Sequence, residues 1–288
     1  MSQPIETVAN YYLQYDQNDR IADQYTDVAF PADVYSRMKY GSHSATNFFA
    51  SQLADRLAYN LPQLIEDAEP PEFLVAYKAV PPACYYLSAL CLESLNDRRA
   101  AVDNEPGFIT QVYKDRVTGT NYAMASSQER QAELDDIGFS LPHSINNTPA
   151  VILDDIRITG GAEKKILEVL DNEKPSIIAL GYIAIFDPAQ AVSRPSVEME
   201  LNSTTIQSID DLLPLIKTSD FDLNIRTLKM MLSSSEVALD HFLRACPAEL
   251  VGQIHRGTQA SGETFVAHYR ETARLIAMHA EYRGVAGV

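Results

Sequence analysis

The segment from residue 150 to residue 170 constrains the fold of this chain more than any other. Residues 150–153 read Ala-Val-Ile-Leu, an apolar run typical of a strand buried on both faces in an α/β sheet. Asp154 and Asp155 follow this run, and a Thr-Gly-Gly turn at 159–161 leads into the helical pattern of residues 162–170. This order predicts a ligand site at the end of a parallel strand, which is where open α/β sheets bind ligands.

The acids and the turn offer opposite chemistry to that ligand. Adjacent side chains of a strand point in opposite directions, so we expect Asp154 and Asp155 to lie where the strand leaves the sheet. Two glycines let backbone N–H groups converge, and the helix that follows adds the positive end of its dipole, which suits an anion. Carboxylates beside an amide cradle therefore predict a sugar-phosphate site.

The same residues resemble the motif that binds 5-phosphoribosyl 1-diphosphate (PRPP) in the type I phosphoribosyltransferases. The resemblance implies that Asp154 and Asp155 are the catalytic acids and bind the ribose hydroxyls. The order Asp-Asp-Ile-Arg-Ile-Thr-Gly, with Glu163 following, is most similar to the phosphoribosyltransferase-like proteins of bacterial tellurium-resistance and stress-response gene clusters. The loop that the resemblance assigns to the 5-phosphate comprises Ile156, Arg157, Ile158, Thr159, Gly160, Gly161 and Ala162.

The motif departs from the family pattern at three places in this loop. Arg157 and Ile158 stand where small or hydroxylated residues are usual, and Ala162 stands where a hydroxyl residue is common. One hydroxyl that could bind the phosphate is therefore absent. A P-loop is excluded, because it would need Lys-Ser or Lys-Thr after its last glycine.

Strand and helix patterns alternate through the middle of the chain. We expect strands near 73–80, 108–113, 150–153 and 177–186, with helices near 82–95, 128–137 and 162–170. Alternation of this kind predicts an α/β fold with a mostly parallel sheet, here of the type I phosphoribosyltransferase kind.

The two ends of the chain read as helical. Phe49, Leu53, Leu57 and Leu61 are spaced by four and predict a helix that begins near Ser44. A second helix is expected over 263–283. The resemblance implies three parts. Residues 1–69 form a helical N-terminal hood, residues 70–190 form the phosphoribosyltransferase-like core, and residues 191–288 are a helical part at the C-terminal end.

Further site elements are expected outside the motif. By resemblance, Lys78 and Ala79, at the end of the strand over 73–80, bind pyrophosphate, together with Arg116 from the loop after the next strand. Two alternatives stay open: Pro81 and Pro82 lack N–H donors, so the first turn also fits a plain strand-to-helix connection, and Arg116 also fits a solvated loop. The candidates for the acceptor site are Arg37, Lys39 and Tyr40, and the alternative that these long cations and tyrosines pack as amphipathic surface also stays open.

Composition limits the partners and the compartment. The formal charge of −16 argues against nucleic acid or an anionic membrane surface as the main partner, because both would repel the protein. The three cysteines, Cys84, Cys91 and Cys246, lack metal-ligand spacing and fit buried free thiols in a reducing compartment. We find neither a signal peptide pattern nor an apolar run long enough to span a bilayer, and expect a cytoplasmic protein.

The predicted activity is transfer of the 5-phosphoribosyl group from PRPP to a nitrogenous, base-like acceptor, or the reverse reaction with pyrophosphate. The resemblance implies Mg²⁺, held through the ligand rather than by a protein cluster, and a homodimer is a further expectation. The alternative is a regulatory protein that binds PRPP or a nucleotide without chemistry. A phosphate-ester hydrolase ranks last.

Overall fold

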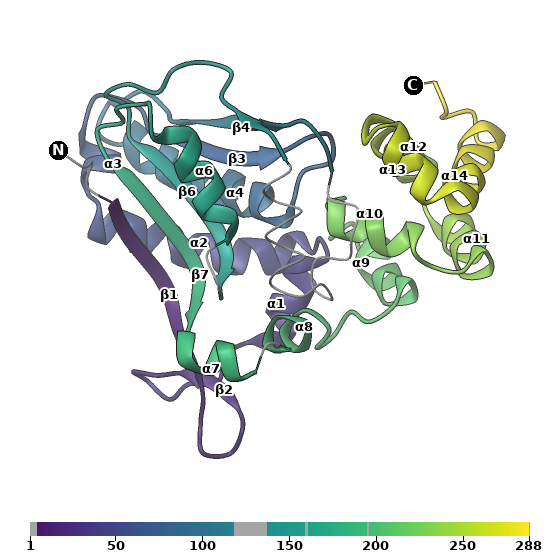
Figure 1. Cartoon of the computed structure of the whole chain (residues 1–288), viewed down its shortest axis with the longest axis horizontal. Coiled ribbons are helices and arrows are strands. Elements are labelled where there is room, and N and C mark those ends of the chain that lie inside the picture. The colour runs from purple at the N-terminus through teal and green to yellow at the C-terminus, as the bar shows by residue number, and fades with distance from the viewer. Residues whose placement is uncertain (1–4, 118–136, 159–160, 195, 288) are drawn as a thin grey trace.

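The computed structural model describes residues 5–117, 137–158, 161–194 and 196–287. Within these ranges the strands form one seven-stranded sheet in the order β2-β1-β7-β6-β3-β4-β5 (Figure 1). The strands are β1 (Ile5–Tyr15), β2 (Ile21–Asp23), β3 (Glu72–Tyr77), β4 (Phe108–Lys114), β5 (Phe139–Ser140), β6 (Ala150–Arg157) and β7 (Ile178–Phe186).

The five inner strands are parallel. β1 pairs with β7, β7 with β6, β6 with β3, and β3 with β4, whereas the short edge strands β2 and β5 are antiparallel to their neighbours. The first four residues of β6 and the first seven of β7 are buried, as expected for strands covered on both faces. The predicted fold class, a mostly parallel sheet with flanking helices, is confirmed.

The prediction of a wholly helical N-terminal region is wrong for residues 5–23. These residues form β1 and β2, and β1 pairs with β7 from Ile5 to Leu13. The β-favouring residues Thr7, Val8, Tyr11 and Tyr12 were the local signal for a strand. The sheet therefore takes in the start of the chain, and it is not confined to residues 70–190.

Helices cover both faces of this sheet. Phe49, Leu53 and Leu57 on α2 are fully buried, as predicted, and α2 and α4 pack on the face that carries Phe73. Helix α6 packs on the opposite face through Ile166 and Leu170. The helices of this part are α1 (Ala32–Lys39), α2 (His43–Asn60), α3 (Gln63–Glu66), α4 (Ala83–Ala100) and α6 (Gly161–Leu170).

The rest of the chain is helical, as predicted. From Ile206 to Ala280 it forms most of a second hydrophobic cluster, with residues such as Leu228, Phe242 and Ile276, and this cluster also includes Tyr40 and Val80. No described helix is both long and apolar enough to cross a bilayer. The helices are α7 (Pro188–Ser193), α8 (Val197–Asn202), the 3-10 helix η1 (Ile209–Leu212), α9 (Leu213–Lys217), α10 (Ile225–Leu232), α11 (Glu236–Ala245), α12 (Ala248–Ala260), α13 (Glu263–His268) and α14 (Arg270–Tyr282).

One predicted helix is divided in the structure, and another lies mostly outside the described residues. The single helix expected over 263–283 is wrong, because Tyr269 leaves the helical backbone (φ −110°, ψ 35°) and separates α13 from α14. The ring of Tyr269 packs edge-on against Phe265, with centroids 5.1 Å apart. The helix expected over 128–137 falls almost entirely outside the described residues.

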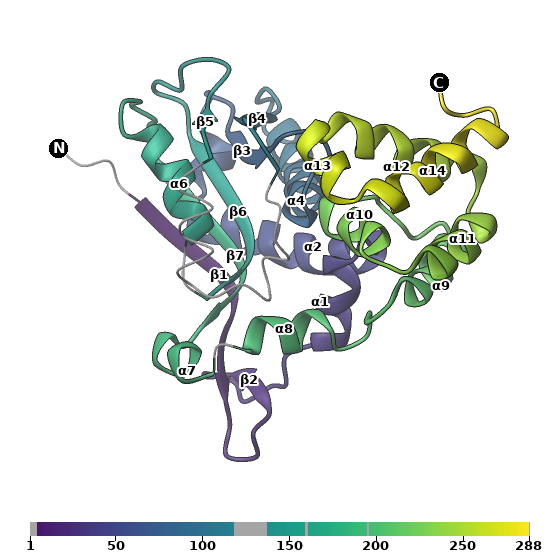
Figure 2. The ribbon, with the colours of Figure 1, turned by 45° about the vertical axis from the view of Figure 1, so that its right-hand side comes forward.

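The helices α9–α14, here called the C-terminal region, pack against the loop between β3 and α4. The backbone N–H of Ile225, the first residue of α10, donates to the Pro81 carbonyl at 2.9 Å. On α12, a Cβ at Gly257 would lie only 2.7 Å from Val80 Cγ2, so glycine permits this close approach. Figure 2 shows these helices beside α1, α2 and α4, beyond the ends of the strands.

Candidate functional site

The acidic pair lies within strand β6 rather than after it. β6 extends to Arg157 and pairs with β7 through that residue, which corrects the expectation that the acids follow the end of the strand. Its pairing with β3, by contrast, stops at Val151. β6 therefore loses one neighbour just before Asp154 and Asp155, and this opening lets adjacent acids within a strand reach a cavity.

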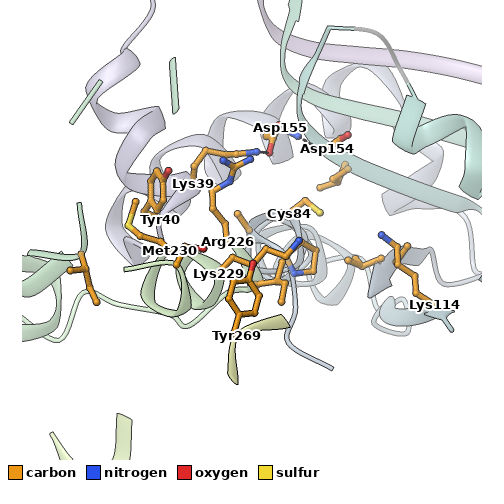
Figure 3. A pocket seen from close by; sticks show the side chains of 18 of the residues that line it. Lys39, Tyr40, Cys84, Lys114, Asp154, Asp155, Arg226, Lys229, Met230 and Tyr269 are labelled. Atoms are coloured by element: carbon orange, nitrogen blue, oxygen red, sulfur yellow. Dashed lines mark hydrogen bonds and ion pairs between the residues drawn. The ribbon is translucent and has the colours of Figure 1, made fainter. Parts of the chain in front are cut away.

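Asp155 is paired with Lys39 from the end of α1. The Lys39 Nζ donates to Asp155 Oδ2, and the Ile156 N–H donates to Asp155 Oδ1 at 2.7 Å (Figure 3). Lys39 is only 8% exposed, and its Nζ also lies 5.9 Å from the ring centroid of Tyr35. A residue predicted to bind the acceptor thus contacts one of the predicted catalytic acids.

The two acids have pKa values shifted in opposite directions. Burial, and then the charge of Asp155, raise the pKa of Asp154 to about 7. Burial also acts to raise the pKa of Asp155, but Lys39, the Ile156 N–H and the Arg226 guanidinium together lower that pKa below its usual value. Near neutral pH Asp155 is therefore ionised, whereas Asp154 is partly protonated.

A cavity of about 650 Å³ lies between this pair and the C-terminal region. Arg226 and Lys229 from α10 line it, and Figure 3 shows the Arg226 side chain beside Lys39. Its lining includes four basic and four acidic side chains among the described residues, in a protein with a net charge of −16. Met230 and Tyr269 add apolar surface. The cavity therefore suits a ligand with both an anionic and an apolar part.

The residues expected to bind pyrophosphate do not line this cavity. The Lys78 Nζ points to α13, because a Cβ built at Gly262 would lie 3.2 Å from it. Ala79 lies in the loop that the C-terminal region covers. Arg116 lies 3.6 Å from the Asp115 carboxylate and is exposed. These three residues are not brought together with the acidic pair.

The acceptor candidates separate into two groups. Lys39 and Tyr40 line the cavity, and the ring of Tyr40 lies 5.9 Å from the guanidinium carbon of Arg226. Arg37, on the other hand, lies 3.3 Å from the Asp33 carboxylate one turn earlier and is partly exposed outside the cavity. Lys39 and Tyr40 are the acceptor candidates that the structure brings to the acidic pair.

The predicted phosphate loop is described in part. Ile156 is buried, and Ile158 is partly buried against the hydrophobic cluster that contains Phe73. Thr159 and Gly160 lie outside the described residues. Gly161 and Ala162 are the first two residues of α6.

Arg157 in this loop is bound to an acid rather than directed into the cavity. Its guanidinium lies 3.2 Å from the Glu163 carboxylate and 5.8 Å from the ring centroid of Tyr182. Glu163 lines the cavity and is 7% exposed, and its Oε2 has no hydrogen-bond partner among the described residues. Burial raises the pKa of Glu163, which Arg157 only partly offsets.

Comparison with known proteins identifies the family. The model of the PRTase ComF-like family matches residues 18–261. The chain belongs to this family. The resemblance to phosphoribosyltransferases is thus confirmed at the family level, and the link to tellurium resistance stays a prediction.

Solved structures similar to this ComF-like chain include two purine phosphoribosyltransferases. One is the hypoxanthine phosphoribosyltransferase from Staphylococcus aureus, at 19% identity over 47% of this chain and 62% of that chain, with a TM-score of 0.31. The other is the hypoxanthine-guanine phosphoribosyltransferase from L. donovani, at 12% identity over 50% and 70%, with a TM-score of 0.32. The chain thus spans less than two thirds of the Staphylococcus aureus protein. No curated protein sequence is significantly similar to it.

The cavity of this PRTase ComF-like protein contains basic residues that sequence reasoning missed. Arg226 and Lys229 are three residues apart on α10, so they share one helix face, and this spacing in an acidic chain was the available signal. Lys114, the last residue of β4, also lines the cavity, and burial lowers its pKa. Cys84 lines the cavity near the acids, and burial raises the pKa of its thiol.

Proposed function

We propose that this protein is a phosphoribosyltransferase that binds PRPP and transfers its 5-phosphoribosyl group to a nitrogenous, base-like acceptor, or carries out the reverse reaction with pyrophosphate. One observation carries the proposal: the half-buried Asp154–Asp155 pair faces a cavity of about 650 Å³ in a PRTase ComF-like chain. A cavity of this size holds a small molecule.

The hydrogen bonds around the pair assign different roles to the two acids. Asp155 has both oxygens engaged, by Lys39 and by the Ile156 N–H, and Asp154 Oδ1 accepts from the Asp155 N–H at 2.9 Å. Among the described residues, this leaves Asp154 Oδ2 as the acceptor for a ribose hydroxyl. Asp155 then positions Lys39 and adds negative charge near the sugar, which favours an oxocarbenium-like transition state.

The donor set fits Mg²⁺ that arrives with the substrate. No group of three or more His, Cys, Asp or Glu side chains among the described residues could hold the ion by itself. Asp154 supplies one carboxylate, and Mg²⁺ ordinarily combines one or two carboxylates with substrate phosphates and retained waters. When bound, the ion would neutralise the charge of the diphosphate leaving group.

We assign the 5-phosphate to the loop over 156–162, as the motif predicts. Its support is the start of α6 at Gly161, where backbone N–H groups and the helix dipole favour an anion. Glu163 opposes this charge, and the pair with Arg157 compensates it in part. We propose that the protein acts in a stress response of the kind that tellurium-resistance gene clusters serve. We further propose that it works in the cytoplasm and as a homodimer.

A second function is favoured by two specific observations. The Lys39 ion pair already occupies Asp155, and the buried Glu163 carboxylate lies next to the predicted phosphate loop. Both would weaken turnover without preventing a ligand from entering the cavity. A regulatory protein that binds PRPP or a nucleotide without chemistry is therefore the alternative.

The deciding experiment combines turnover with binding. The protein is incubated with PRPP, MgCl₂ and a panel of nitrogenous bases, and released diphosphate is measured. Release that depends on the base supports transfer, whereas calorimetric binding of PRPP without release supports the regulatory alternative.

A variant of the acidic pair tests the site itself. We expect Asp155→Asn to lose PRPP binding, while Asp171→Asn, which removes the same charge from an exposed position, keeps it. Unchanged PRPP affinity in both Asp155→Asn and Asp154→Asn would show that the acidic pair is not the ribose site.

A further inference from the structure

The loop between β3 and α4 is poorly suited to bind the diphosphate of PRPP. Helix α4 begins at Ala83 with Pro82 as its N-cap, and Pro81 precedes it, so two positions at this helix start have no N–H donor. The carbonyl of Pro81 already accepts the Ile225 N–H at 2.9 Å. The Tyr86 hydroxyl donates to the Leu223 carbonyl at 2.8 Å, which binds the segment before α10 to α4.

The contacts that cover this loop also bring α10 to the cavity. The Asn224 side chain caps α10 by accepting from the Thr227 N–H at 3.0 Å, and it donates to the Lys39 carbonyl at 3.2 Å. Asn224 is fully buried, so this link between α10 and α1 is shielded from water. The start of α10 is therefore held against both the β3–α4 loop and the end of α1.

Because α10 is held at this place, two of its basic residues reach the cavity. Arg226 and Lys229 both line the cavity, and Figure 3 shows the Arg226 side chain reaching from α10 toward Lys39 and Asp155. The guanidinium of Arg226 lies 3.9 Å from the Glu198 carboxylate, at the long end of the ion-pair range. Its planar fork suits two-point binding to phosphate oxygens.

Hydroxyl groups complete the same part of the cavity wall. Ser233, Ser234 and Ser235 follow α10 directly and line the cavity. The guanidinium and the ammonium offer several N–H donors to an anion with several oxygens. The serines make this wall polar, although the Ser234 hydroxyl itself donates to the Met230 carbonyl at 2.8 Å. The acidic pair lies across the cavity, on β6.

We propose that Arg226 and Lys229 of α10 form the diphosphate-binding part of this site, in place of the β3–α4 loop. The inference rests on the proposed function, because it takes the ribose of the same ligand to lie on Asp154 and Asp155. The C-terminal region thereby covers the position where a diphosphate was expected and supplies the cations that bind it.

The test measures two small ligands separately by isothermal titration calorimetry. Inorganic diphosphate probes the α10 cations, and ribose 5-phosphate probes the acidic pair and its loop. We expect Arg226→Gln and Lys229→Gln each to weaken diphosphate binding about tenfold or more, the usual effect of losing a charged hydrogen bond. Ribose 5-phosphate affinity should change less than about twofold in the same variants.

Matched controls remove a positive charge elsewhere. Lys78→Gln removes it from the predicted loop, and Arg274→Gln removes it from the exposed face of α14. Both should leave diphosphate affinity unchanged. If Arg226→Gln does not fold, Arg226→Lys keeps the charge without the two-point geometry, and a several-fold loss of diphosphate affinity is then expected.

Several outcomes would overturn the inference. Unchanged diphosphate affinity in Arg226→Gln would do so, as would a loss in Lys78→Gln. Weakened binding of a carboxylate-bearing base, with diphosphate unaffected, would move Arg226 to the acceptor site. If diphosphate binds through Arg226 but ribose 5-phosphate does not bind the unaltered protein, the anion site stands and the transfer proposal fails.

Discussion

The sheet and the C-terminal region contribute to one cavity in different ways. The sheet supplies acids on a strand whose first four residues are buried, so the position of Asp154 and Asp155 is fixed by the core. The C-terminal region packs around a second hydrophobic cluster, which Tyr40 and Val80 join, and supplies Arg226 and Lys229 on a helix of eight residues. The contrast teaches that a site can depend as much on how two parts dock as on the motif that identifies it.

The largest expected effect comes from the ion pair between α1 and β6. Lys39→Met leaves Asp155 charged without its partner, and we expect a loss of about 3 kcal/mol in the free energy of unfolding at pH 7.5. Urea denaturation measures it, with Lys217→Met on the exposed face of α9 as the control. The loss should shrink toward acidic pH, since the lowered pKa of Asp155 contributes stability that disappears as this acid is protonated. Equal effects of the two variants would contradict the pairing.

A smaller effect is expected where the two parts dock. Asn224→Ala removes the cap of α10 and the hydrogen bond to the Lys39 carbonyl, which should cost about 2 kcal/mol. Diphosphate affinity should fall as well, because Arg226 follows two residues later. Asp187→Ala removes a helix cap from α7 alone and should leave diphosphate affinity intact. If both variants change diphosphate affinity to a similar extent, the contacts of Asn224 do not position Arg226 for diphosphate binding.

The pH dependence of Asp154 gives a third effect, of about 2 kcal/mol between pH 5.5 and pH 8. Its pKa is raised to about 7, so the folded protein holds a proton that the unfolded chain has released, and stability falls as pH rises through this range. Asp154→Asn removes that penalty, and its gain in Tm should be larger at pH 8 than at pH 5.5. Asp171→Asn should show no such difference. A gain that does not depend on pH would contradict the shifted pKa.

The smallest expected effect is that of Lys78, which was predicted to bind pyrophosphate but does not line the cavity. Lys78 points to α13 rather than to the acidic pair, so Lys78→Gln should change the free energy of unfolding by less than about 0.5 kcal/mol. Thermal denaturation and the release of diphosphate from PRPP both measure this variant. A loss of turnover comparable to that of Asp155→Asn would restore Lys78 to the site.

The sequence predicted what short-range periodicity encodes. The apolar run before Asp154 and the spacing of Phe49, Leu53 and Leu57 report burial directly, so the inner strands and α2 were predictable. Strand β1 was missed, because its tyrosines and polar residues lack a clear alternation and its partner β7 lies far along the chain.

Contacts between distant segments were beyond the reach of the sequence. Lys39 was expected near the acceptor, but its pairing with Asp155 joins residues 116 positions apart. Lys78 and Arg116 were placed by resemblance, and the docking of α10 and α13 on the β3–α4 loop is a feature that the motif does not encode. Arg226 gained its place only through that docking.

The absence of a side chain at Gly257 bears on the size of ligand that the cavity can hold. Because α12 rests on Val80 at that point, with Leu228 of α10 beside it, the depth to which these helices settle fixes the span from guanidinium to carboxylate. One added methyl group would lie 2.7 Å from Val80 Cγ2, so we expect Gly257→Ala to push α12 away from the β3–α4 loop and to lengthen that span. The length of molecule that can bridge the cavity is therefore set by an atom that never touches it.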